Sequence, residues 1–152
     1  MRRRPDAMRR LRSAIDKRAR SKFKYGRFDC CAAAFDVWKA QSGVDIFKRQ
    51  RGYDSYLTAA KVLKRWTPKG TPKAARLEVM VAKLMRDHGM VEVDVLRAQR
   101  GFIVLIEGET PDGVMDALGV VDLDGIYVLI PWQSGGWCKM PLSMARRAWG
   151  VA

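Results

Sequence analysis

Histidine and cysteine are scarce in this sequence of 152 residues, which has one histidine and three cysteines, Cys30, Cys31 and Cys138. An odd number of cysteines, two of them adjacent, does not form the paired framework of a disulfide-rich secreted domain. One imidazole and three thiols without paired spacing also lack the ligand pattern of a structural zinc site. We therefore expect a reduced protein that holds no metal ion and no cofactor.

Long apolar runs are missing as well. No run approaches the roughly 18 residues that a membrane-spanning helix requires, and the first residues lack the apolar stretch of a secretory signal. We expect neither a membrane span nor an export signal. The length, with 48% hydrophobic residues, suits one folded domain.

Acidic residues are few compared with basic ones, 16 against 29, which gives a net charge of +13. Residues 1–24 hold eleven Lys or Arg against two Asp, a net +9, and the remainder carries only +4. We therefore divide the chain into a basic amino-terminal arm, residues 1–24, and a domain over residues 25–152. The candidate residues for binding nucleic acid or another partner are Arg2, Arg3, Arg4, Arg9, Arg10, Arg12, Lys17 and Arg18.

Clustered cations of this kind favour nucleic acid, an anionic membrane surface or an acidic protein groove. The alternative is a solvated charged helix that only aids solubility. Met8, Leu11 and Ile15 recur at helical spacing, so residues 6–21 are predicted to form a helix whose narrow apolar stripe packs on the body.

Helical patterns fill the first half of the chain. Further helices are expected over residues 29–42, with Asp29 as cap and Gly43 as stop, from after Gly52 to Trp66, and from Thr71 and Pro72 to Gly89.

Patterns typical of strands fill the second half. They cover residues 91–95, 102–106, 117–123 and 126–130, and a last short helix is predicted over 141–149. Helices first and strands later predict an α+β domain.

The best-signalled helix opens with Asp29-Cys30-Cys31. The positive end of a helix stabilises a thiolate, so Cys30, in the first turn, is a candidate nucleophile. The alternative is that both cysteines are small buried apolar residues, and Cys31 is expected to pack inward beside Phe35.

The surroundings of this helix form a recognisable set with five later segments. The set consists of residues 25–38 (YGRFDCCAAAFDVW), 42–45 (SGVD), 51–53 (RGY), 97–105 (RAQRGFIVL), 117–121 (ALGVV) and 145–149 (ARRAW). It resembles a phage-encoded family related to NlpC-type cysteine peptidases. The resemblance implies a papain-like NlpC-type fold, with amino-terminal helices followed by a small antiparallel sheet, and a place at the tip or in the hub of a phage tail.

The resemblance also implies a catalytic set, which the sequence only partly supplies. Cys30 matches the nucleophile, but the general base should be a histidine where the chain has Ala117, and Phe102 replaces an Asp of the first core strand. A cysteine peptidase needs an imidazole to take and return a proton. His88, the one histidine, is a weak candidate base, because it falls at a helix end where bonding the last carbonyls is its ordinary role.

Three hypotheses follow. The first is a structural tail component in the virion that contacts other tail proteins and keeps a peptidase-like scaffold without the full catalytic set. The second is an active cell-wall endopeptidase that cuts peptidoglycan with Cys30. The third is a protein that binds DNA through the basic arm.

Overall fold

The structure is a computed structural model that describes residues 1–110 and 113–152. Its helices are α1 (Ala7–Arg18), α2 (Cys30–Ser42), α3 (Tyr56–Arg65) and α4 (Arg76–Asp87). Its strands are β1 (Val91–Val93), β2 (Ile103–Thr110), β3 (Gly113–Val121), β4 (Tyr127–Pro131), β5 (Trp137–Pro141) and β6 (Ala145–Gly150). Three short 3-10 segments are η1 (Lys73–Ala75), η2 (Val95–Arg97) and η3 (Leu142–Met144).

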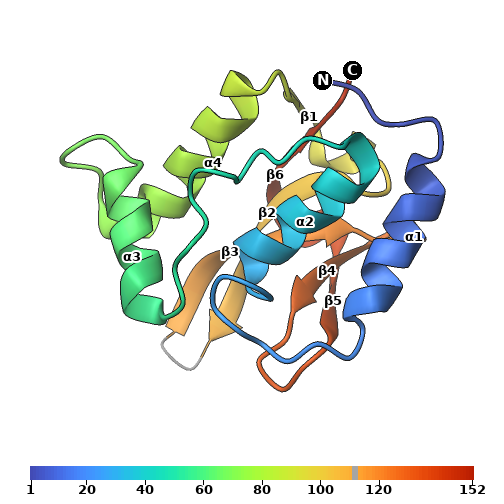
Figure 1. Ribbon diagram of the computed structural model, residues 1–152. Coiled ribbons are helices and arrows are strands. Elements are labelled where there is room, and N and C mark those ends of the chain that lie inside the picture. The colour runs from blue at the N-terminus through green and yellow to red at the C-terminus, as the bar shows by residue number, and fades with distance from the viewer. Residues whose placement is uncertain (111–112) are drawn as a thin grey trace.

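The six strands form one sheet in the order β1-β6-β2-β3-β4-β5, and every neighbouring pair is antiparallel. In Figure 1, α2 crosses in front of the sheet, with α1 on one side of it and α3 and α4 on the other. The predicted α+β class and the antiparallel sheet are confirmed. None of the helices in the described ranges is long and apolar enough to cross a membrane.

The core lies between α2 and the middle strands. Residues 103–106 of β2 are completely buried, so both faces of this strand are covered. From α2, Phe35, Val37 and Trp38 are completely buried in the same apolar cluster. These contacts hold α2 against the sheet and fix the position of its first turn.

The amino-terminal helix packs against this core. Leu11, Ala14 and Ile15 of α1 are buried in the cluster that contains α2, and the indole N–H of Trp137 in β5 donates to the carbonyl of Ile15 at 3.0 Å. Leu11 and Ile15 of the predicted apolar stripe are therefore residues by which α1 is attached, whereas Met8, which was predicted to pack with them, is 37% exposed. Most of its cations remain on the opposite, solvent-facing side.

Two predicted helix starts are wrong. Helix α3 begins at Tyr56, three residues later than expected, because Ser55 and Thr58 form a reciprocal capping box, and Tyr53 is buried before the helix. Thr71 does not cap α4. Pro72 is followed by the 3-10 turn η1, and the α-helix begins only at Arg76.

The predicted helix over residues 141–149 is also wrong. The segment forms the 3-10 turn η3 and then β6, which lies between β1 and β2. A shift of register between Leu105 and Ile106 in the β2 pairing accommodates Arg146. The guanidinium of Arg146 binds Asp116 of β3 and Glu78 of α4, each at 2.9 Å. The charged residues that suggested the exposed face of a helix therefore link the sheet to α4.

Candidate functional site

Cys30 is the first residue of α2, as predicted, and Asp29 is its cap. One carboxylate oxygen of Asp29 accepts the N–H of Ala32 at 2.9 Å, and the other accepts the N–H of Gly26 at 2.6 Å. The buried carboxylate thus ends the preceding loop and starts the helix. Both of its oxygens are occupied by the backbone.

The second thiol is enclosed. Cys31 is buried, as predicted, and all three cysteines are free. Its hydrogen bond with Cys30, together with burial and the nearby Asp29 carboxylate, raises the pKa of the Cys31 thiol well above its ordinary value. Burial, together with the neighbouring Cys31, Asp29 and Cys30 groups, also raises the pKa of Tyr53. These groups therefore stay neutral at physiological pH.

The side chains of Asp29, Cys30 and Cys31 bring one carboxylate oxygen and two sulfurs within 4.8 Å of one another. Such a set can in principle hold a soft metal ion. The carboxylate, however, already accepts two backbone N–H groups. The cluster is accounted for by the start of the helix.

His88 follows the last residue of α4, and its Nδ1 lies 2.9 Å from the carbonyl oxygen of Leu84. Bonding a carbonyl of the last turn is the ordinary role of a residue at a helix end, which the sequence analysis set against a role as general base. In Figure 1, α4 ends at the top of the molecule, whereas α2 begins near its centre, in front of the sheet. The structure therefore does not bring His88 to Cys30. Ala117 is a half-buried residue of β3 that pairs with Ile106 of β2.

Part of the predicted binding arm is built into the fold. The guanidinium of Arg3 lies 4.7 Å from the ring centre of buried Phe102, and burial lowers the pKa of this arginine. The guanidinium of Arg4 lies against Gly43 at the end of α2, where a cation favours the helix dipole. Arg3 and Arg4 therefore anchor the chain before α1.

The remaining predicted residues belong to α1 or precede it. Arg9 and Arg10 bind Asp6 at 2.7 and 2.9 Å, and Arg18 is partly buried. Arg2, Arg12 and Lys17 are exposed and, within the described ranges, have no ion-pair partner.

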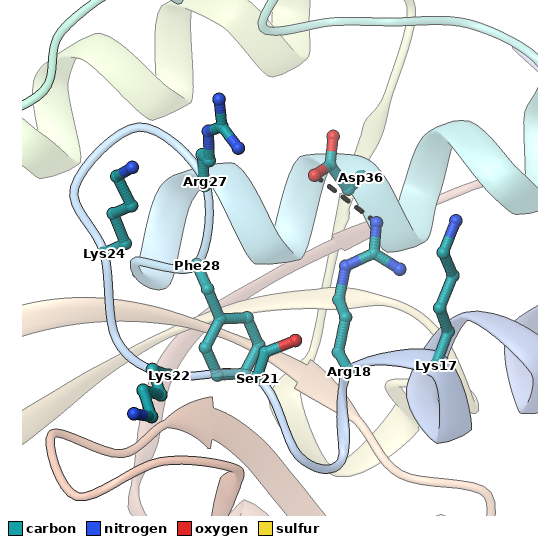
Figure 2. A pocket seen from close by; sticks show the side chains of 8 residues that line it. All are labelled: Lys17, Arg18, Ser21, Lys22, Lys24, Arg27, Phe28 and Asp36. Atoms are coloured by element: carbon teal, nitrogen blue, oxygen red, sulfur yellow. Dashed lines mark ion pairs between the residues drawn. The ribbon is translucent and has the colours of Figure 1, made fainter.

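A basic hollow of about 330 Å³ lies where α1 ends and the loop to α2 begins. Its lining combines five cations with a hydroxyl, an aromatic ring and one carboxylate, namely Lys17, Arg18, Lys22, Lys24, Arg27, Ser21, Phe28 and Asp36. Figure 2 shows these side chains around the loop, with Arg18 turned toward Asp36.

The single carboxylate of the basic hollow is already neutralised. Asp36 binds Arg18 at 3.4 Å and Arg51, which lies outside the hollow, at 2.7 Å. The other four cations, Lys17, Lys22, Lys24 and Arg27, make no ion pair with any residue in the described part of the chain. The basic hollow therefore presents uncompensated positive charge.

The sheet holds the loop of the basic hollow in place. The N–H of Gly136, in the turn between β4 and β5, donates to the carbonyl of Ser21 at 2.8 Å. The ring of Phe28 packs edge-on against Trp137 with 5.1 Å between centroids, and Lys24 forms a bridge with Phe28. The cations of the loop therefore project from a backbone that is fixed at both ends.

A second, more open depression continues from the first along the exposed side of α1. It is lined by Arg9, Arg12, Ser13, Asp16 and Lys17. Lys17 lines both depressions, so the cations form one surface from Arg9 to Arg27.

A family model described as a domain of unknown function, DUF6950, matches residues 2–151. The chain belongs to this family. The DUF6950 match includes α1 and the loop of the basic hollow together with the sheet. Searches of curated proteins and of solved structures gave no significant match.

Sequence reasoning did not single out three residues of the basic hollow, Lys22, Lys24 and Arg27. Their signal is visible in residues 22–28 (KFKYGRF), where cations alternate with aromatic residues. Such interleaving is typical of surfaces that bind nucleic acid, but here the ring of Phe28 is buried against Trp137 and supports the loop, so the cations are the part of this pattern that faces solvent.

Proposed function

We propose that this chain is a papain-like domain of NlpC type that has lost catalysis and serves as a structural component of a phage tail tip or hub. The resemblance in sequence supports this proposal, as does a capped helix that begins at a cysteine and packs on an antiparallel sheet. Its partners are then other tail proteins.

One observation carries the loss of catalysis. The chain has a single histidine, and the Nδ1 atom of that histidine bonds its own helix at Leu84. Ala117, which takes the place of the expected base, has no group that exchanges a proton. Within residues 1–110 and 113–152, the Cys30 thiol therefore lacks the imidazole that would take its proton and return it to a leaving group.

The surroundings of Cys30 agree with this proposal. Neither of the two depressions described above includes Cys30 or Cys31. Both oxygens of the adjacent Asp29 carboxylate accept backbone N–H groups, so this carboxylate is engaged in starting the helix.

The first test restores the missing base. In an Ala117→His variant, a papain-like arrangement places the new imidazole beside Cys30. Alkylation by iodoacetamide at pH 7 should then be faster by on the order of tenfold, because an imidazolium stabilises the thiolate. Ala117→Gln controls for the change in size, and Cys30→Ala in the same background identifies the reacting thiol. An unchanged rate in folded Ala117→His protein would count against the papain-like arrangement.

The second test concerns activity in the unmodified chain. Wild-type protein should release no peptide fragments from peptidoglycan, and phage that carry Cys30→Ala should assemble and infect normally. Hydrolysis that disappears in the Cys30→Ala variant would establish the endopeptidase hypothesis instead. Absence of the protein from purified virions would refute the place in the tail.

A further inference from the structure

We propose that the basic hollow and the adjoining exposed side of α1 bind the phosphate backbone of a nucleic acid. This inference is independent of the proposed function, since it involves neither Cys30 nor the papain-like resemblance. It rests on the charge, the chemistry and the fixed geometry of one surface.

The first step concerns charge. Lys17, Lys22, Lys24 and Arg27 are exposed around one depression and, in residues 1–110 and 113–152, no carboxylate pairs with them. Like charges held close together repel each other, which disfavours such a cluster unless a counter-charge arrives. A phosphate supplies that charge and accepts hydrogen bonds from each cation.

The second step concerns the class of partner. The centre of a protein–protein interface is depleted in charge, and lysine is depleted there, whereas an interface with nucleic acid is polar and strongly positive. Among the described residues, the one apolar residue type in the lining of the basic hollow is Phe28, and it is 3% exposed. The exposed lining is therefore made of cationic groups, their aliphatic stems and a hydroxyl, without the exposed aromatic or aliphatic side chain that anchors a protein partner.

The third step concerns extent. Arg9, which is paired with Asp6, and the unpaired Arg12 continue the surface along α1 to Lys17, and Asp16 is the one carboxylate among the described residues that line this depression. At about 1.5 Å per residue, Arg9 and Lys17 lie about 12 Å apart along the helix axis, and the loop extends the surface further. A duplex carries one negative charge per about 1.7 Å, so a surface of this length faces several phosphates at once.

The site is built for backbone contact. Contacts to base edges carry sequence information, whereas contacts to phosphates do not. The cations that surround the basic hollow are suited to phosphates. We therefore expect binding that depends strongly on salt and little on sequence.

The test measures binding of a fluorescein-labelled duplex DNA of 20 base pairs by anisotropy at several salt concentrations. The full-length variant has four substitutions, Lys17→Gln, Lys22→Gln, Lys24→Gln and Arg27→Gln. Each phosphate contact adds about 0.9 to the slope of log K against log salt. With four contacts removed, the variant should therefore lose about 3.6 units of slope and weaken binding at least about tenfold at low salt.

The control removes the same charge elsewhere. Lys61, Lys64, Lys69 and Lys73 are exposed on α3 and on the connection to α4, on the other side of α2 from α1 in Figure 1. Their replacement by glutamine should leave the slope within about 1 unit of wild type. An equal loss of slope in both variants would show that only net charge matters, and it would overturn the site. Wild-type protein that does not bind either duplex would overturn it as well.

Two further probes identify the source of the phosphates and test the alternative partner. An RNA duplex of the same length, run beside the DNA, shows which backbone the site accepts, and binding of either one supports the proposal. Labelled polyglutamate represents an acidic protein. If it binds more tightly than both duplexes and loses affinity in the Lys17, Lys22, Lys24 and Arg27 variant, the site serves an acidic protein and the proposal fails. Circular dichroism confirms that each variant is folded, as expected for exposed substitutions.

Discussion

Replacing the cap of α2 tests how far Asp29 is a structural residue. In an Asp29→Ala variant, the N–H groups of Ala32 and Gly26 lose the oxygens that accept them at 2.9 and 2.6 Å. The carboxylate is 5% exposed, so water cannot freely replace it. The change removes a helix cap and the closure of the preceding loop together.

The two losses have separate magnitudes. Removal of an N-cap acceptor costs about 1 kcal/mol. A second, poorly solvated N–H without a partner adds about 1–3 kcal/mol. We therefore expect the free energy of unfolding to fall by about 2–4 kcal/mol, and the melting temperature to fall by about 5–15 °C.

Urea denaturation followed by far-ultraviolet circular dichroism measures this change. Asp29→Asn keeps one side-chain oxygen acceptor and should fall between wild type and Asp29→Ala. Cys30→Ala, one residue away, leaves both hydrogen bonds intact and serves as the matched control. An Asp29→Ala variant that unfolds within about 0.5 kcal/mol of wild type, the usual effect of a surface change, would refute the capping role.

Three other outcomes are expected. The hydrogen bond from Arg147 lowers the pKa of Glu92 below its ordinary value of 4.5. The stability that this pair contributes is therefore complete above pH 4.5 and is lost as the pH falls through the lowered pKa. In a Glu92→Gln variant, the unfolding free energy should decline less steeply below pH 4.5 than in wild type. Gly136→Ala should destabilise the fold more than Gly135→Ala in thermal melts. Both glycines have a positive φ, but a Cβ at Gly136 would lie 2.7 Å from the carbonyl oxygen of Ala19, whereas a Cβ at Gly135 would lie 3.5 Å from that of Ser21, an ordinary contact. Equal losses would show that the clash is unimportant. Asp36→Asn should lower the melting temperature, through weaker bonds to two guanidiniums, yet tighten binding of duplex DNA; unchanged DNA binding would show that the basic hollow is not where DNA binds.

The helices that could be predicted best from the sequence are those whose ends are marked by residues close to them in the chain. Helix α2 has a side-chain cap at Asp29 and a left-handed glycine with φ of 82° at Gly43, and both residues act within one turn of the helix ends. Its bounds could therefore be predicted to the residue. The start of α3 was harder, because the apolar pattern continues through Tyr53, which is buried in the core without belonging to the helix.

Long-range pairing explains the largest error. The charges of Arg146 and Arg147 obscure the alternation expected of a strand, and β6 depends on partners distant in sequence. Glu78 of α4 binds both guanidiniums, at 2.9 and 3.3 Å. A segment whose charges are paired across the fold cannot be distinguished locally from a solvated helix.

The same limit applies to the candidate site. Net charge identified the basic arm, but it could not separate Arg3 and Arg4, which anchor the chain, from Lys17, which faces solvent. The basic hollow also requires Asp36 and Arg27, which lie outside the arm in sequence. Only folding brings them together.

The attachment of α1 to the core has a consequence for the entropy of any binding event. A loose basic tail that orders on a partner loses about 1–2 kcal/mol of conformational free energy for each residue whose backbone it fixes. Here Leu11, Ala14 and Ile15 are already buried in the core. The backbone of α1 has therefore lost this conformational entropy during folding, before any ligand binds. What remains to be ordered is mainly the long side chains. A surface of this kind can bind a polyanion, even with low affinity, without first ordering its own backbone. Unlike a flexible tail, however, it cannot extend into solvent to contact a polyanion at a distance.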